Sequence, residues 1–170
     1  MNKKEINIDK FHIPRWNELP NIDLYLDQVV NLINSTLSPY IFLNNDEKKE
    51  NIQVLTKTMI NNYVKNNLIE APQKKLYSKI QLAKLFVICI LKQVYSMQDI
   101  NTLISISLEK TTAAEKYDTF CELFEKALVC TFNQEDFIDN NTENSHLLKT
   151  VLLSCSYKIY VQNVTQNEKK

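Results

Sequence analysis

The sequence predicts an all-α fold, a compact bundle of about six helices, and three observations support this prediction. Glycine is absent from all 170 residues, whereas tight hairpins and strained turns favour glycine. Apolar residues recur at three- and four-residue spacing over most of the chain. Ser78, Ser96 and Thr112 each stand three residues before Gln, Asp or Glu, which is the pattern of a helix capping box.

The missing glycines also argue against several kinds of functional site. A P-loop, a dinucleotide-binding turn, a nucleophile elbow and an EF-hand each need glycine where the backbone approaches a ligand or takes a positive φ. No cysteine belongs to a C-x-x-C pair, and no histidine has Cys or carboxylate neighbours at ligand spacing. These residues are Cys89, Cys121, Cys130, Cys155, His12 and His146. We therefore expect buried cysteines, no metal or cofactor, and no enzymatic activity.

Membrane insertion and export are not expected. The longest apolar run, residues 85–91, is too short to span a bilayer. The lysines in residues 1–10 are not followed by an apolar stretch, so no secretory signal is predicted. Together with the unpaired cysteines, these features predict a soluble, cytoplasmic protein.

The first helix is predicted to follow an irregular segment, residues 1–20, and to begin at Asn21 as its cap. It should end near Ser38 and Pro39, because a residue before proline disfavours helical backbone. Its apolar stripe comprises Ile22, Tyr25, Leu26, Val29, Val30, Ile33 and Leu37. The polar residues 44–51 predict a loop.

The second helix is predicted over about residues 56–66. Thr56 is its expected N-cap, and Asn67 can take the left-handed conformation that stops it. Pro72 then interrupts the chain, and residues 74–77 are expected to be short and extended.

The central helix is predicted over about residues 79–94, after a capping box at Ser78. It is apolar all round at its middle, so residues 85–91 should be the most buried stretch. Three more helices are expected, one after Ser96, one after Thr112 and one over about residues 145–163, the last preceded by an acidic loop.

Positive charge is concentrated in residues 51–95. This segment has seven lysines and one acidic residue, Glu70, for a net charge of +6, while the rest of the chain has 13 basic and 19 acidic residues, for −6. The lysines are Lys57, Lys65, Lys74, Lys75, Lys79, Lys84 and Lys92. Such a local concentration attracts phosphate backbones, although a solvated helix face gives a similar count.

The same part of the chain has a capped helix, a turn with proline, a short basic segment and a second capped helix in that order. The residues at the marker positions are Leu55, Thr56, Tyr63, Leu68, Ile69, Pro72, Lys75, Tyr77, Ser78, Ser96, Asp99 and Ile100. In this order and spacing, residues 55–108 resemble the DNA-binding domain of MerR-type regulators.

The resemblance implies a winged helix-turn-helix, with a recognition helix at about 56–66, a wing at about 72–77 and double-stranded DNA as the partner. The expected DNA-contacting residues are Lys57, Thr58, Asn61, Asn62, Lys65, Lys74 and Lys75. Asparagine can pair with adenine edges and lysine suits phosphates. A single domain is expected over residues 1–170, with its helix-turn-helix-like part at 20–108. Helix-turn-helix proteins commonly dimerise, and the helical pair at 112–165 is the natural interface or effector lobe.

An alternative function remains open. MerR-type recognition helices usually carry arginine where this chain has Thr58 and Asn61. MerR-type proteins also continue into one long dimerisation helix, whereas this chain breaks at Thr111 and Thr112. The chain could therefore be a non-catalytic protein-interaction module, an adaptor or an antirepressor, that keeps the helix-turn-helix shape without binding DNA.

Most of the chain also resembles an uncharacterised bacterial family of domains of unknown function. The shared words are RWNELPNIDLY from Arg15, DQV from Asp27 and LTKTMINNYVK from Leu55. This resemblance implies no activity. Trp16, Tyr25, Asp23 and Asp27 could line a groove for a partner. The preferred interpretation is that Trp16 closes the core beside the first helix.

Overall fold

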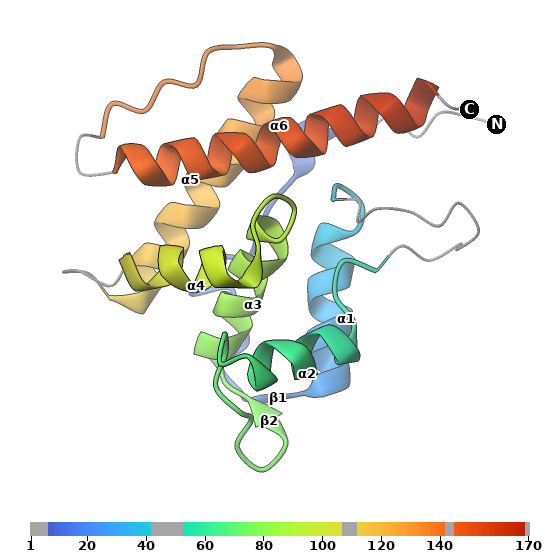
Figure 1. The fold of residues 1–170 in the computed structure, drawn as a ribbon, viewed down its shortest axis with the longest axis vertical. Helices are drawn as coiled ribbons and strands as arrows, with labels where there is room; N and C mark the ends of the chain where they lie inside the picture. Colours follow the sequence, from blue (N-terminus) through green and yellow to red (C-terminus); the bar gives the residue numbers. More distant parts are fainter. Residues whose placement is uncertain (1–6, 42–52, 107–111, 142–144, 169–170) are drawn as a thin grey trace.

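The computed structural model describes residues 7–41, 53–106, 112–141 and 145–168, and its architecture is predominantly helical, as predicted (Figure 1). Two very short strands pair in an antiparallel sheet, with Leu24 opposite Tyr77 and Tyr25 opposite Leu76. The elements of the described residues are η1 (Ile8–Lys10), β1 (Leu24–Tyr25), α1 (Leu26–Leu37), α2 (Lys57–Lys65), β2 (Leu76–Tyr77), α3 (Lys79–Leu91), α4 (Met97–Ile106), α5 (Ala113–Asn133) and α6 (His146–Glu168).

The start of α1 differs from the prediction. Asn21 does not cap a helix, because Leu24 and Tyr25 form β1 and pair with β2. The helix begins at Leu26, where the Gln28 side chain accepts a 2.9 Å hydrogen bond from the Tyr25 backbone N–H. As a result, Ile22 and Tyr25 are exposed and do not belong to the apolar stripe. Of the rest of the stripe, Val29, Val30, Ile33 and Leu37 are buried as predicted, and Leu26 is partly buried.

The predicted caps of the later helices are present. The Thr56 hydroxyl accepts the Met59 N–H at the start of α2, and Ser78 with Gln81 forms a capping box at the start of α3. Equivalent bonds join Ser96 to Asp99 and Thr112 to Glu115. Asn67 has a positive φ of 56°, as expected of a left-handed stop. Each such cap contributes about 1 kcal/mol to its helix.

The central helix α3 carries the core, as its sequence predicts. All but Val87 of residues 85–91 are buried, and α1, α5 and α6 pack around α3. A stretch that is apolar on every side is stable only when neighbouring helices cover it. No described helix meets the length and apolarity needed to cross a membrane.

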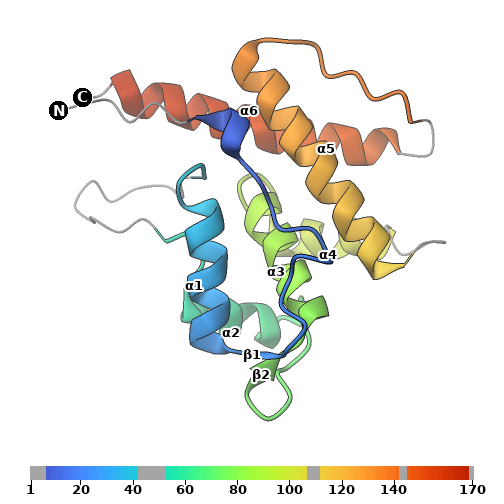
Figure 2. The same ribbon diagram turned by 180° about the vertical axis from the view of Figure 1, so that it is seen from behind.

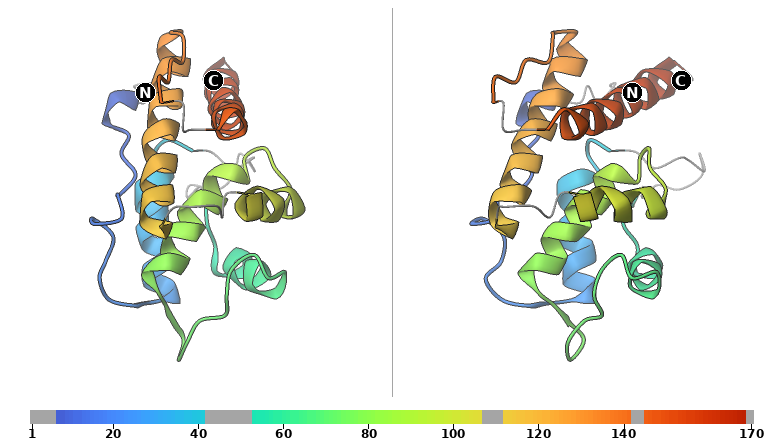
Figure 3. Two further views of the ribbon diagram at one scale, coloured as in Figure 1. Left: turned by 90° about the vertical axis from the view of Figure 1, so that its left-hand side faces the viewer. Right: turned by 60° about the vertical axis from the view of Figure 1, so that its left-hand side comes forward.

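Helices α5 and α6 form the most extensive helix pair and lie at one end of the molecule, while α2 and the turn before β2 lie at the other (Figures 1 and 3). Val151, Leu152, Cys155 and Ile159 of α6 are buried, in agreement with the predicted stripe. The helix continues to Glu168, beyond the predicted end at about residue 163.

The N-terminal segment is more structured than the sequence suggested. Residues 8–10 form a 3₁₀ turn, and Phe11, Ile13 and Leu19 are buried. Figure 2 shows this segment running from η1, near α5 and α6, to β1 at the opposite end of the molecule. The buried positions of this segment could not be predicted, because its apolar residues follow neither a helical nor a strand period. The predicted loop at 44–51 lies outside the described residues.

Candidate nucleic-acid interface

The seven residues predicted to contact DNA are all exposed, and they come from two places in the fold. Five lie on α2 and two on the turn between Gln73 and Leu76, which we call the basic turn. The α2 residues are Lys57, Thr58, Asn61, Asn62 and Lys65, and the basic turn contributes Lys74 and Lys75. The opposite side of α2 is anchored by Ile60 and Tyr63, which are buried in the core. Because the Tyr63 side chain is buried, the pKa of its hydroxyl is raised and the side chain stays neutral.

A shallow hollow of about 440 Å³ lies between α2 and the basic turn. Three of the predicted residues, Lys57, Asn61 and Lys75, line it together. The other lining residues are Tyr25, Leu26, Asp27, Pro72 and Tyr77. Thr58, Asn62, Lys65 and Lys74 are exposed but do not line the hollow. The fold therefore brings the N-terminal half of α2 and the second lysine of the turn to one site.

The position of α2 depends on an asparagine that the sequence did not single out. The Asn34 side chain on α1 accepts the backbone N–H groups of Val54 and Leu55 at 2.7 and 3.0 Å. Its amide nitrogen donates to the Leu55 carbonyl at 2.7 Å. These bonds fix the two residues that lead into the Thr56 cap. A nine-residue helix is marginal on its own, so such anchoring decides where α2 lies.

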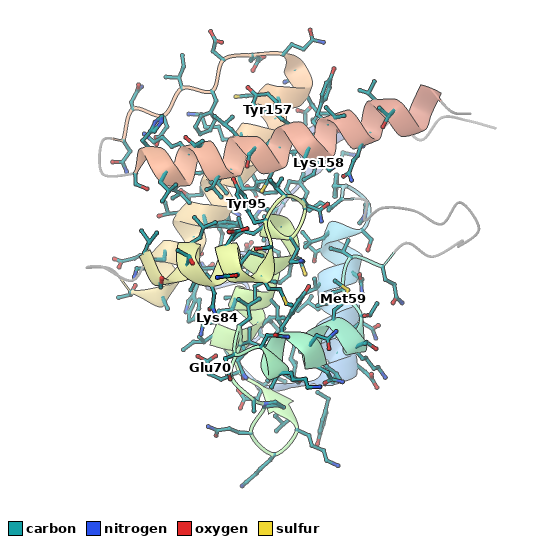
Figure 4. The ribbon with its side chains drawn as sticks, viewed as in Figure 1. Met59, Glu70, Lys84, Tyr95, Tyr157 and Lys158 are labelled. Carbon is teal, nitrogen blue, oxygen red and sulfur yellow. The ribbon has the colours of Figure 1, made fainter. Side chains whose placement is uncertain are left out.

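The base of the basic turn is held by polar contacts from α3. The buried Gln81 side chain donates to the Glu70 carbonyl at 2.8 Å and accepts the Ser78 N–H at 2.8 Å. Lys84 and Glu70 form an ion pair of 2.6 Å, and both are labelled in Figure 4 below α4 and beside α2. This ion pair lowers the pKa of the Glu70 carboxyl. The segment between α2 and α3 is thus fixed at both sides of the turn.

The missing glycines argued against tight hairpin turns, but the tip of the basic turn is one. The Gln73 N–H donates to the Leu76 carbonyl at 3.0 Å and the Leu76 N–H donates to the Gln73 carbonyl at 2.8 Å, which closes a two-residue hairpin turn. Its central residues Lys74 and Lys75 have φ values of 50° and 68°. Such a turn favours glycine or asparagine, because a Cβ in this region costs about 1 kcal/mol per residue. Here two lysines occupy it and are presented at its tip.

The surroundings of the lysines also revise the charge count. Lys84 is paired with Glu70, and Lys79 donates to Asn21 at 2.7 Å and lies 5.4 Å from the Trp16 ring centroid. These two lysines support the fold. Trp16 itself is partly buried against the core, as expected.

Two residues that line the hollow were not among the predicted DNA contacts, although the sequence offered both as possible lining of a partner groove. Asp27, at the start of α1, forms an ion pair with Lys57, and both side chains are largely exposed. Tyr25, with 59% of its surface exposed, lies beside Asp27 in the wall of the hollow. The sequence assigned Tyr25 to the core because it matched the helical stripe. The pairing of β1 with β2, which brings both residues to the basic turn, has no local sequence signal.

The described residues contain no cluster of His, Cys, Asp or Glu that could hold a metal ion. The four cysteines are buried and unpaired, as predicted. Burial raises the pKa of Cys121 and of Cys155 to about 12, so both thiols are protonated at neutral pH and are poor nucleophiles.

Comparisons with known proteins place the chain in a family without assigning it an activity. Neither the curated proteins nor the solved structures include a significant match to this sequence. One family profile matches residues 14–127, which run from the N-terminal segment through α1, α2, the basic turn, α3 and α4 into α5. Because this match covers more than half of the chain, the protein belongs to the family described as Domain of unknown function (DUF1836).

Proposed function

We propose that the protein binds double-stranded DNA through α2 and the basic turn, as a non-enzymatic transcriptional regulator of the winged helix-turn-helix type. The observation that carries the proposal is the convergence of Lys57, Asn61 and Lys75 on one exposed hollow. The order of α2, a turn, a short strand and a capped helix also agrees with the MerR-type resemblance.

The chemistry of the two parts suits different components of DNA. On α2, Asn61 and Asn62 are exposed amides that can read base edges in a major groove. On the basic turn, Lys74 and Lys75 are exposed, and no ion pair involving either is found among the described residues. Unpaired lysines at a protruding tip are suited to phosphates, which position a protein on the duplex but carry no sequence information.

The proposal is tested by measuring the affinity for a random-sequence duplex over a range of salt concentrations. Each lysine–phosphate contact releases counterions, which gives a log–log slope of about −0.9 per contact. The double variant Lys74→Ala/Lys75→Ala should bind all sequences more weakly and flatten the slope by up to about two units.

A charge-matched control is available on the same chain. Lys92, at the C-terminal end of α3, and Lys116, on α5, lie outside the candidate interface. The double variant Lys92→Ala/Lys116→Ala removes the same charge and should leave the slope within about half a unit of wild type. An equal loss in both double variants would show that net charge, and not the basic turn, controls binding.

Sequence reading needs a separate measurement. The variant Asn61→Ala should change the sequences selected from a random-DNA pool while keeping the salt slope, because an amide that pairs with a base makes no phosphate contact. An unchanged selection with Asn61→Ala and with Asn62→Ala would remove the base-reading role of α2.

One observation favours the alternative of a protein-interaction module. Half of the residues that line the hollow are aromatic or apolar, namely Tyr25, Leu26, Pro72 and Tyr77. Aromatic side chains are enriched where proteins bind proteins. If wild-type protein shows no salt-dependent binding to any duplex at low ionic strength, the DNA proposal is wrong and this alternative takes its place.

A further inference from the structure

Helix α6 carries apolar side chains on two opposite faces. Its inner face, with Val151, Leu152, Cys155 and Ile159, is buried against the rest of the molecule. Its outer face follows the spacing of three and four residues that marks one side of a helix. The outer residues are Thr150, Leu153, Tyr157, Val161 and Val164. None of these five is charged, whereas the solvent side of a surface helix normally carries charged and polar residues.

Four of these five side chains are exposed, and Leu153 is partly buried. Tyr157 is 56% exposed and Val161 is 53% exposed. Tyr157 and Lys158 lie midway along α6 (Figure 4). The helix crosses the end of the molecule remote from the basic turn, and its ends extend past α5 (Figures 1 and 2). The described part of the chain therefore leaves most of this face uncovered, above all from Tyr157 to Val164.

We propose that the outer face of α6 is a homodimer interface in which it packs against α6 of a second copy. Self-pairing sets each face against an identical one, so a charged face would repel itself and an uncharged face would not. With 23 residues at about 1.5 Å each, α6 is about 34 Å long. A specific interface has to bury at least about 1,000 Å² in total, so the contact has to extend over most of this length.

The dimer adds to the proposed function and does not depend on it. A helix-turn-helix dimer sets two recognition helices on successive major grooves. Contact through α6 leaves α2 and the basic turn of both copies free, since they lie at the other end of each molecule (Figure 3). The sequence pointed to the helices after Thr112 in general, and the structure assigns the contact to one face of α6, since α5 buries its apolar side under α6 and α3.

The test is the molar mass in solution, measured by light scattering during size-exclusion chromatography at high micromolar concentration. Wild type should be a dimer, and Val161→Asp should be a monomer, because the charge would face its counterpart across the interface. The matched control is Ile138→Asp, which places the same charge on an equally exposed apolar side chain in the loop before α6. This control should remain a dimer.

Circular dichroism keeps the result interpretable. Val161→Asp should keep the helical content of the control, because the side chain is exposed in the single chain. The variant Tyr157→Cys provides a second readout, since the native cysteines are all buried. A short bismaleimide should cross-link this variant into dimers. A wild type that is monomeric at high concentration, or a Val161→Asp variant that stays dimeric, would overturn the proposal, whether or not the protein binds DNA.

Discussion

Two groups of charged residues in this protein differ in burial and in role: one stabilises the fold, and the other is the candidate interface. The first, which we call the strap cluster, joins the N-terminal segment to α5 and consists of His12, Arg15, Glu18 and Glu125. The second, the candidate interface, spans α2 and the basic turn. In the strap cluster Arg15 and Glu125 are about four-fifths buried, whereas Lys57 and its partner Asp27 are mostly exposed.

The hydrogen bonds of the two groups differ as much as their burial. The Glu125 carboxylate accepts two bonds from the Arg15 guanidinium, at 2.8 and 2.5 Å, and a third from the Ile13 N–H at 2.6 Å. The bidentate bond to Glu125 raises the pKa of Arg15 further. Lys57 has a single ion pair, and for Lys74 and Lys75 none is found among the described residues. The buried charges that stabilise the fold have a full set of hydrogen bonds, whereas the exposed lysines have few partners and are available to bind another molecule.

The largest effect should come from breaking the strap cluster. Glu125→Ala leaves the Arg15 guanidinium and the Ile13 N–H without their acceptor in a partly dry site. We expect the free energy of unfolding to fall by about 3 kcal/mol, as in other buried pairs that lose one partner. Urea denaturation measures it, with Glu122→Ala, an exposed neighbour on α5, as the control expected within about 0.5 kcal/mol of wild type. Equal losses of unfolding free energy in both variants would show that the strap cluster stabilises the fold no more than an exposed residue does.

The sequence predicted what depends on local patterns. The caps at Thr56, Ser78 and Thr112 and the buried run of α3 each follow from residues within a few positions of one another. The contacts of Arg15 with Glu125 span 110 positions, and the pairing of β1 with β2 is also long-range, so neither has a local signal. For this reason the sequence around Arg15 does not reveal that its side chain ties the N-terminal segment to α5.

The candidate site was predicted in part for the same reason. The exposure of all seven residues follows from the helical period of α2 and the polarity of the turn. The presence of Tyr25 and Asp27 in the site does not follow from such local patterns, because the pairing of β1 with β2 brings them there. The charge count also treated all seven lysines alike, whereas contacts with Trp16 and Glu70 assign Lys79 and Lys84 to the fold.

The basic turn offers an intermediate effect, in which stability and binding change in opposite directions. Lys75→Gly removes the Cβ that disfavours a φ of 68° and should stabilise the protein by about 1 kcal/mol. Lys75→Ala keeps the Cβ and should not. Both variants lose the same charge and should weaken DNA binding equally. Thermal unfolding and the salt-dependent affinity separate the two contributions. If glycine is no more stable than alanine, the left-handed turn carries no strain.

The smallest effect is expected at Asp27, which pairs with Lys57 in the candidate interface. An exposed ion pair contributes about 0.2–1 kcal/mol, and a phosphate that binds Lys57 has to compete with the Asp27 carboxylate for it. Asp27→Asn removes the competing charge and keeps the shape of the side chain. We expect the affinity for duplex DNA to rise by about threefold, with a free energy of unfolding within about 0.5 kcal/mol of wild type.

The control for Asp27→Asn is Asp23→Asn, which removes one charge from an exposed aspartate that does not line the hollow. A general reduction of negative charge would raise affinity equally in both variants, whereas the release of Lys57 raises it only in Asp27→Asn. The comparison should be made at low ionic strength, because salt screens the interactions of exposed charges, with a Debye length of about 10 Å at 0.1 M. If Asp27→Asn binds duplex DNA no better than Asp23→Asn, then Lys57 makes no phosphate contact, and the interface is restricted to the rest of α2 and the basic turn.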